Sequence, residues 1–86
     1  MKADKKKVEK LLKTARGQID GILKMIEEDR YCIDVSTQLM AAASVLQRAN
    51  KEVLSAHLKS CVARAETPEE IDEKVDEFIR IMEKVL

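Results

Sequence analysis

Helix-breaking residues are scarce in this sequence, which has two glycines and one proline among 86 residues. Sheets and loop-rich folds need many more turn residues, so this scarcity argues against both. Alanine, leucine, lysine and glutamate, which favour helices most, are abundant instead. The composition therefore predicts an all-α protein, and the length leaves room for a single domain, which we expect to span residues 1–86.

Aromatic residues and long apolar runs are nearly absent as well. Only Tyr31 and Phe78 are aromatic, so the predicted core is aliphatic. No run approaches the 18 or more apolar residues of a membrane-spanning helix, and no apolar secretion signal opens the sequence. Two cysteines are too few for a secreted disulfide scaffold. We therefore expect a cytoplasmic protein with reduced thiols and no membrane partner.

Charge of one sign is not in excess overall, but it is unevenly distributed. Residues 1–24 carry eight Lys/Arg and three Asp/Glu, whereas residues 62–86 carry four and eight. A basic first segment can bind an anionic partner even on a neutral protein. A solvated helix face would have the same composition, so this pattern alone leaves both interpretations open.

Three segments have apolar residues at helical spacing. The first, from about residue 5 to 28, has a stripe that we expect to be buried: Val8, Leu12, Ala15, Ile19, Ile22 and Ile26. Close helix packing is the expected reason for Gly17 and Gly21 within it. The second segment, from about residue 31 to 64, is apolar on several sides and should lie antiparallel to the first. Such a helix is roughly 50 Å long, more than the remaining chain can cover, so we expect an oligomer.

The third predicted helix has a strong start signal. Thr67 is expected to cap it, Pro68 to take its first position, and Glu70 to complete a capping box. Its predicted inner face consists of Ile71, Val75, Phe78, Ile79, Met82 and Val85. The sequence thus predicts a long central helix, paired with the first helix and followed by a short third one.

Cys32, His57 and Cys61 share one face of the second predicted helix. At 100° per residue, His57 and Cys61 fall about 20° to either side of Cys32. His57 and Cys61 are one turn apart and can reach one metal ion, but Cys32 is roughly 37 Å away along the same helix. An antiparallel copy would place Cys32 of one chain beside His57 and Cys61 of its partner. Two-fold symmetry would then form this site twice. The pattern predicts a two-chain metal or thiol site, unless the cysteines are simply buried apolar residues.

Two thiolates and one imidazole are soft ligands that suit Cu(I), with Zn(II) as a non-cognate competitor. Three ligands favour Cu(I), because structural zinc normally takes four. The surrounding motifs closely resemble the CsoR/RcnR family of sensing repressors over essentially the whole chain. The matching segments are residues 16–22 (RGQIDGI), 28–35 (EDRYCIDV), 38–39 (QL), 46–50 (LQRAN) and 57–61 (HLKSC).

The resemblance implies an all-α dimer that pairs into a tetramer and binds operator DNA without a helix-turn-helix motif. It implies that ligand binding releases the DNA and derepresses export or detoxification genes. The Cys32, His57, Cys61 set matches the copper-sensing branch. Nickel- and cobalt-sensing members use additional histidines, persulfide-sensing members lack the histidine, and formaldehyde-sensing members usually have an N-terminal proline where this chain has Lys2.

Further roles follow from the same resemblance. Tyr31 and Glu77 match positions that support the histidine ligand, since a carboxylate that accepts the free ring N–H fixes the ligand's tautomer. For DNA, the implied contacts are Arg16 and Arg48, with an added stripe of Lys6, Lys10 and Lys13. Some relatives have arginine where this chain has Leu11, a departure that affects individual contacts.

The prediction is a Cu(I)-responsive repressor that binds operator DNA without metal and is not an enzyme. Three alternatives stay open. The first is a persulfide sensor that uses Cys32 and Cys61. The second is an enzyme with a Cys–His nucleophile pair. The third is a helical adaptor without ligand.

Overall fold

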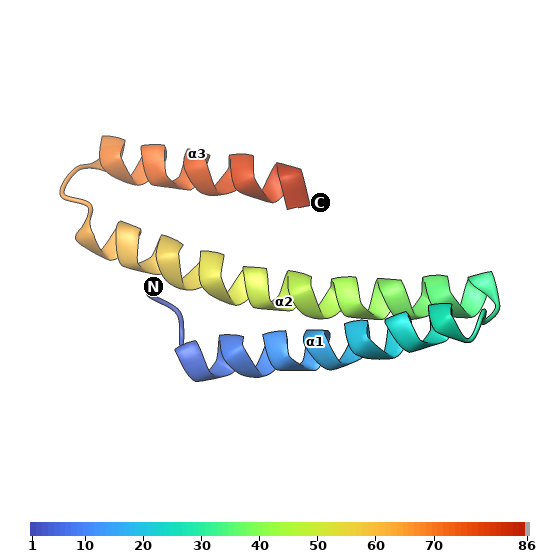
Figure 1. The fold of residues 1–86 in the computed structure, drawn as a ribbon. Helices are drawn as coiled ribbons and strands as arrows, with labels where there is room; N and C mark the ends of the chain where they lie inside the picture. The colour runs from blue at the N-terminus through green and yellow to red at the C-terminus, as the bar shows by residue number, and fades with distance from the viewer. Residues whose placement is uncertain (86) are drawn as a thin grey trace.

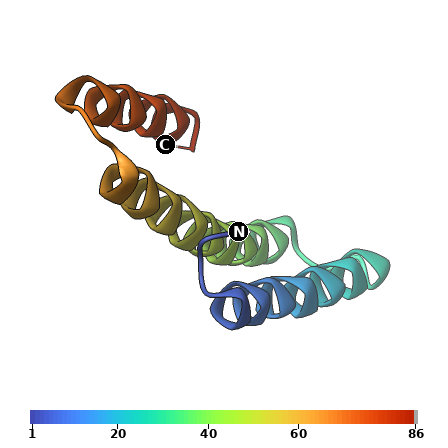
Figure 2. The same ribbon diagram turned by 90° about the vertical axis from the view of Figure 1, so that its left-hand side faces the viewer.

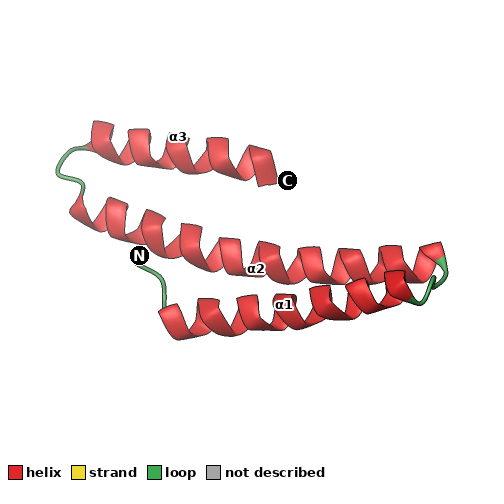
Figure 3. Cartoon of the chain, viewed as in Figure 1, coloured by secondary structure: helices red, strands yellow, loops and turns green. Residues whose placement is uncertain are grey.

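The computed structural model describes residues 1–85, which form three helices (Figure 1, Figure 3). They are α1 (Lys5–Glu27), α2 (Cys32–Arg64) and α3 (Pro68–Val85). These bounds agree with the predicted segments to within about a residue. The predicted all-α, three-helix protomer with a long central helix is confirmed.

The helix α2 lies between the other two helices. Helix α1 runs antiparallel along it, and α3 turns back along its C-terminal half (Figure 1, Figure 2). Within the described residues, α1 packs on α2 and α2 packs on α3, but α1 and α3 do not touch. The helical region is an elongated, flat layer of 57 × 26 × 12 Å, with the smallest dimension about one helix diameter. Its radius of gyration is 17.2 Å, against about 12 Å for a compact domain of this length.

Helix ends are set by local hydrogen bonds. The Asp4 carboxylate accepts from the backbone N–H groups of Lys6 and Lys7 at 3.0 and 3.3 Å, a cap on α1 that the sequence analysis missed. Thr67 Oγ1 accepts from the Glu70 N–H at 3.2 Å, as predicted for the start of α3. The Glu70 carboxylate, however, accepts from the N–H of Glu66 at 2.7 Å rather than from that of Thr67. The predicted capping box is therefore displaced by one residue on its return side.

The core between α1 and α2 is small and aliphatic. The buried residues of α1 are Val8, Ala15 and Ile22. The buried residues of α2 are Ala42, Val45 and Ala49. The prediction that the whole α1 stripe is buried is wrong for one chain: Leu12, Ile19 and Ile26 are 46%, 44% and 60% exposed. A single neighbouring helix covers only one edge of so wide a stripe, and no third helix lies across it.

Helix α3 repeats this pattern on a smaller scale. Val75, Phe78 and Met82 are half-buried, but Ile71 and Ile79 of the predicted inner face are exposed. The Val85 side chain, also predicted for this face, lies outside the described residues. The glycine prediction is wrong within one chain too, because a Cβ built at Gly17 or Gly21 would meet nothing within 4 Å. In the described residues, no helix is long and apolar enough to cross a membrane.

Candidate functional site

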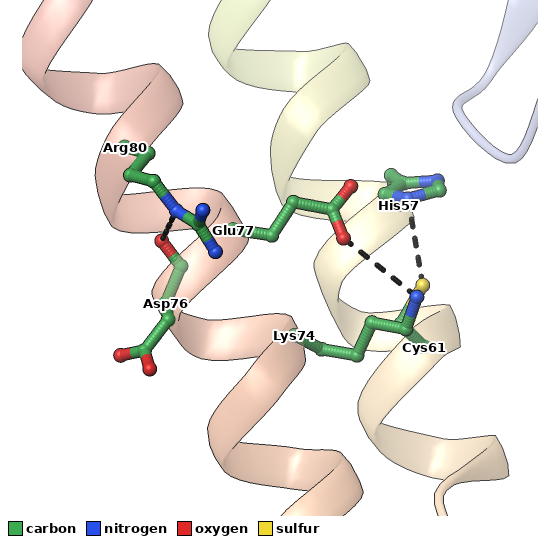
Figure 4. Close-up of polar contacts among 6 residues, drawn as sticks. All are labelled: His57, Cys61, Lys74, Asp76, Glu77 and Arg80. Carbon is green, nitrogen blue, oxygen red and sulfur yellow. Dashed lines mark hydrogen bonds and ion pairs between the residues drawn. The ribbon is translucent and has the colours of Figure 1, made fainter.

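Two of the three predicted ligands come together near the C-terminal end of α2. His57 and Cys61 are one helical turn apart, and the imidazole Nε2 lies 3.4 Å from the Cys61 Sγ (Figure 4). With zinc-like bonds of about 2.3 Å to sulfur and 2.0 Å to nitrogen, one ion would hold these atoms about 3.5 Å apart. His57 is exposed and Cys61 is half-buried, so neither residue is enclosed within the chain. The pair therefore fits two positions of a soft metal's coordination shell.

Cys32, the third predicted ligand, is the first residue of α2 and is exposed with a free thiol. The unbroken helix separates it from His57 by roughly 37 Å at 1.5 Å per residue. Among residues 1–85, no three His, Cys, Asp or Glu side chains gather in a way that could hold an ion. One chain thus carries two of the three predicted ligands near the C-terminal end of α2 and the third at its N-terminal end, and the three-ligand site stays a prediction.

Helix α3 closes one side of the His57–Cys61 pair. A cavity of about 10 Å³ between α2 and α3, with room for about one water molecule, is lined by the following residues: Leu54, His57, Leu58, Cys61, Lys74, Glu77, Phe78 and Ile81. The Glu77 carboxylate extends from α3 toward α2 near His57 (Figure 4). It pairs with Lys74 Nζ at 3.6 Å, and no described hydrogen bond joins it to His57. The supporting role of Glu77 toward His57 therefore stays a prediction.

One residue near the pair was missed from the sequence, and one predicted supporting residue lies far from it within the same chain. Lys74 was missed, although its i,i+3 spacing from Glu77 is the signal of an ion pair on one helix face. Tyr31 lies beside Cys32, is 67% exposed, and is at the opposite end of α2 from His57 of its own chain. Like Cys32, it can support that histidine only in a partner chain.

The predicted DNA-contacting residues are all exposed. Lys6, Lys10 and Lys13 line one shallow groove on α1, together with Glu9 and Thr14. Arg16 extends this surface by sharing the next groove with Lys13. Arg48 projects from α2, one turn before Glu52, which pairs with Lys7 at 3.1 Å and so ties the basic end of α1 to the middle of α2.

The chain is similar to known metal-responsive transcriptional repressors. The family model described as "Metal-sensitive transcriptional repressor" matches residues 4–84. The copper-sensing transcriptional repressor CsoR of Mycobacterium ulcerans is 47% identical over 68 residues, which are 79% of this chain and 58% of that protein. The CsoR of Bacillus subtilis is 30% identical over 81 residues, 94% of this chain and 80% of the relative. The chain spans less than two thirds of the M. ulcerans protein.

Solved structures agree with the sequence relatives. The nickel-responsive transcriptional regulator InrS has a TM-score of 0.78 and 26% identity, with 100% of this chain and 97% of that chain covered. The copper-sensing repressor CsoR with Cu(I) from Geobacillus thermodenitrificans has a TM-score of 0.74 and 30% identity, with 92% and 82% covered. The relatives are named as transcriptional regulators, which supports a regulatory protein over the Cys–His nucleophile alternative. The resemblance inferred from the motifs is confirmed, and the chain belongs to the metal-sensitive transcriptional repressor family.

Proposed function

We propose that this protein is a Cu(I)-responsive transcriptional repressor. In this proposal, the metal-free protein binds operator DNA, and Cu(I) binding at Cys32, His57 and Cys61 releases it to derepress copper efflux or detoxification genes. The observation that carries the proposal is the 3.4 Å approach of His57 Nε2 to Cys61 Sγ beside the α3 cavity. The copper-sensing relatives support the choice of metal. A repressor of bacterial genes would act in the cytoplasm, as expected from the composition.

The proposed site requires two chains, and the exposed apolar surface supports a second copy as the partner. Apolar side chains are exposed on both α1 and α2, in a protein only one helix thick. On α2 they include Ile33, Leu39, Met40 and Leu46. A surface this apolar on a small protein favours association. An antiparallel α2 from a second copy would cover it and carry Cys32 to His57 and Cys61, and two such dimers would form the predicted tetramer.

The ligand atoms set the proposed metal preference. Both thiols must lose their protons to bind, and His57 must bind as the neutral imidazole. Two thiolates and one imidazole suit Cu(I), whereas Zn(II) would lack a fourth protein ligand and so acts as a non-cognate ion. The site's response would reach α3 through Glu77, once its carboxylate leaves Lys74 and accepts the His57 ring N–H that faces away from the ion. The partner's Tyr31 would lie beside the same histidine.

The proposed DNA-binding residues are Lys6, Lys10, Lys13 and Arg16, which line adjoining grooves on α1, and Arg48 of α2, which is also exposed. A tetramer would present this surface four times, which explains how a chain with zero net charge could neutralise many phosphates. Each neutralised phosphate releases counterions, so binding should weaken steeply with salt.

The test is anaerobic binding of the protein to its own upstream DNA, with and without one Cu(I) per chain. We expect tight metal-free binding and its loss on Cu(I) addition, together with Cu–S charge-transfer absorbance. Persulfide in place of Cu(I) tests the thiol-sensor alternative. Release by persulfide but not by Cu(I) would establish that alternative and refute ours. A protein that binds no DNA in either state would be an adaptor.

A further inference from the structure

A lysine stands beside the proposed metal ligands. Lys74 of α3 lines the small cavity with His57 and Cys61, and it also lines a second, larger hollow that Cys61 shares with the end of α2 and the start of α3. Its Nζ lies 3.6 Å from Glu77 Oε2, and both side chains are about half exposed. Figure 4 shows the Lys74 side chain reaching from α3 toward Glu77 and α2. The small cavity beside the proposed site therefore contains one ammonium group and one carboxylate, both from α3.

These charges matter because the net charge of the ion together with its three ligands depends on which ion is bound. Two thiolates and a neutral imidazole leave a charge of −1 around Cu(I) and zero around Zn(II). The Glu77 carboxylate lowers both totals by one, so alone it would favour the ion of higher charge. The Lys74 ammonium cancels that carboxylate and repels the second positive charge of a divalent ion.

We propose that Lys74 is a specificity-determining residue that biases the Cys32–His57–Cys61 site toward monovalent Cu(I) and against divalent ions. The inference rests on the proposed function, because it needs that site to bind metal. Lys74 acts by its charge and not as a ligand, since an ammonium group has no lone pair to offer.

Other charges around Cys61 do not replace this effect. The larger hollow also contains Arg64, Glu70 and Glu73, one cation and two carboxylates. The Glu70 carboxylate already accepts from the Glu66 N–H at the start of α3. A single charge that is half exposed is partly screened by water and salt, so we expect a change in ion preference of about tenfold rather than the much larger effect of a buried charge.

The experiment measures Cu(I) and Zn(II) dissociation constants of the full chain by competition with chromogenic chelators. In Lys74→Gln, the preference for Cu(I) over Zn(II) should fall about tenfold, and in Lys74→Arg it should stay near the parent's. Lys84→Gln, which removes an exposed charge elsewhere on α3, is the matched control and should change nothing. The effect should shrink between about 0.05 and 0.5 M salt, which a purely structural role would not produce.

A double variant tests the mechanism through Glu77. Glu77→Gln alone should raise the Cu(I) preference, and Lys74→Gln with Glu77→Gln should return it close to the parent value. If tight Cu(I) binding persists while Lys74→Gln and Lys74→Met leave the ion preference unchanged, the role of Lys74 is refuted and the sensor proposal stands. If the parent binds no Cu(I) tightly, or if Cys61→Ser binds it equally well, the proposed function itself fails.

Discussion

The exposed edge of α1 should be the place where one chain depends on another. Ile19 and Ile22 are three residues apart on α1. Ile22 is buried, with 5% exposure, whereas Ile19 is 44% exposed. Replacing Ile22 with alanine deletes an intrachain contact and should cost about 2–4 kcal/mol of stability at any protein concentration. Replacing Ile19 should have a smaller effect on the separate chain, since much of its surface already faces water.

The size of the Ile19 effect follows from its remaining exposure. Full burial of an isoleucine side chain is worth about 1.5–3 kcal/mol, so covering the exposed 44% contributes roughly 1 kcal/mol per copy. A two-fold interface contains two copies, which gives about 2 kcal/mol and a rise of about 30-fold in the dissociation constant. We expect Ile19→Ala to weaken assembly by this factor in sedimentation equilibrium.

The comparison with Ile22→Ala is the control for general destabilisation. In Ile22→Ala the melting temperature should fall by a similar amount at every protein concentration, whereas in Ile19→Ala the loss should be greatest at low concentration. An Ile19→Ala protein with the parent's association constant would show that this edge of α1 is not an interface, and the covering of the α1 stripe would need another explanation.

Three further outcomes follow from the proposed site and surface. Cys32→Ala and Cys61→Ala chains should each lose tight Cu(I) binding, but exchanged heterodimers should recover one intact site, and failure to recover it would exclude ligands from two chains. Arg48→Ala or Lys13→Ala should weaken operator binding and flatten its salt dependence without changing Cu(I) affinity, as measured by anisotropy over a salt series. His57→Ala should still bind Cu(I) through the two cysteines yet release DNA poorly, because release requires Cu(I) to bind the DNA-free protein more tightly than the DNA-bound protein. If Cu(I) releases DNA from this variant as fully as from the parent, His57 acts only as a ligand.

The helices could be predicted closely because their signals are local. Thr67 and Pro68 mark the start of α3, and the absence of glycine and proline from residues 31–64 predicts α2 without interruption. What periodicity could not tell is which neighbour covers an apolar face. Leu12 and Ile19 repeat with the same spacing as the buried Val8 and Ala15, so only the packed structure separates the two edges of the stripe.

In the candidate site, too, local contacts could be predicted from the sequence and contacts between helices could not. The His57–Cys61 pair was predictable because residues four apart on a helix are neighbours whatever the tertiary fold. The approach of Glu77 to that region was expected only from family resemblance, since it depends on how α3 turns back along α2. Lys74 could be linked to Glu77 from spacing, but its place beside Cys61 results from the same packing and had no sequence signal of its own.

The separation of α1 from α3 affects how the molecule unfolds locally. In the described residues, each of these helices packs only on α2, so opening of one does not directly loosen the other. Helix α3 packs on the C-terminal half of α2 alone, so its detachment leaves the α1–α2 hairpin and its buried residues intact. Such a segment forms its own cooperative unit, with an opening free energy below that of global unfolding. The wall of the cavity beside His57 and Cys61 can therefore open and close many times during the lifetime of one folded hairpin.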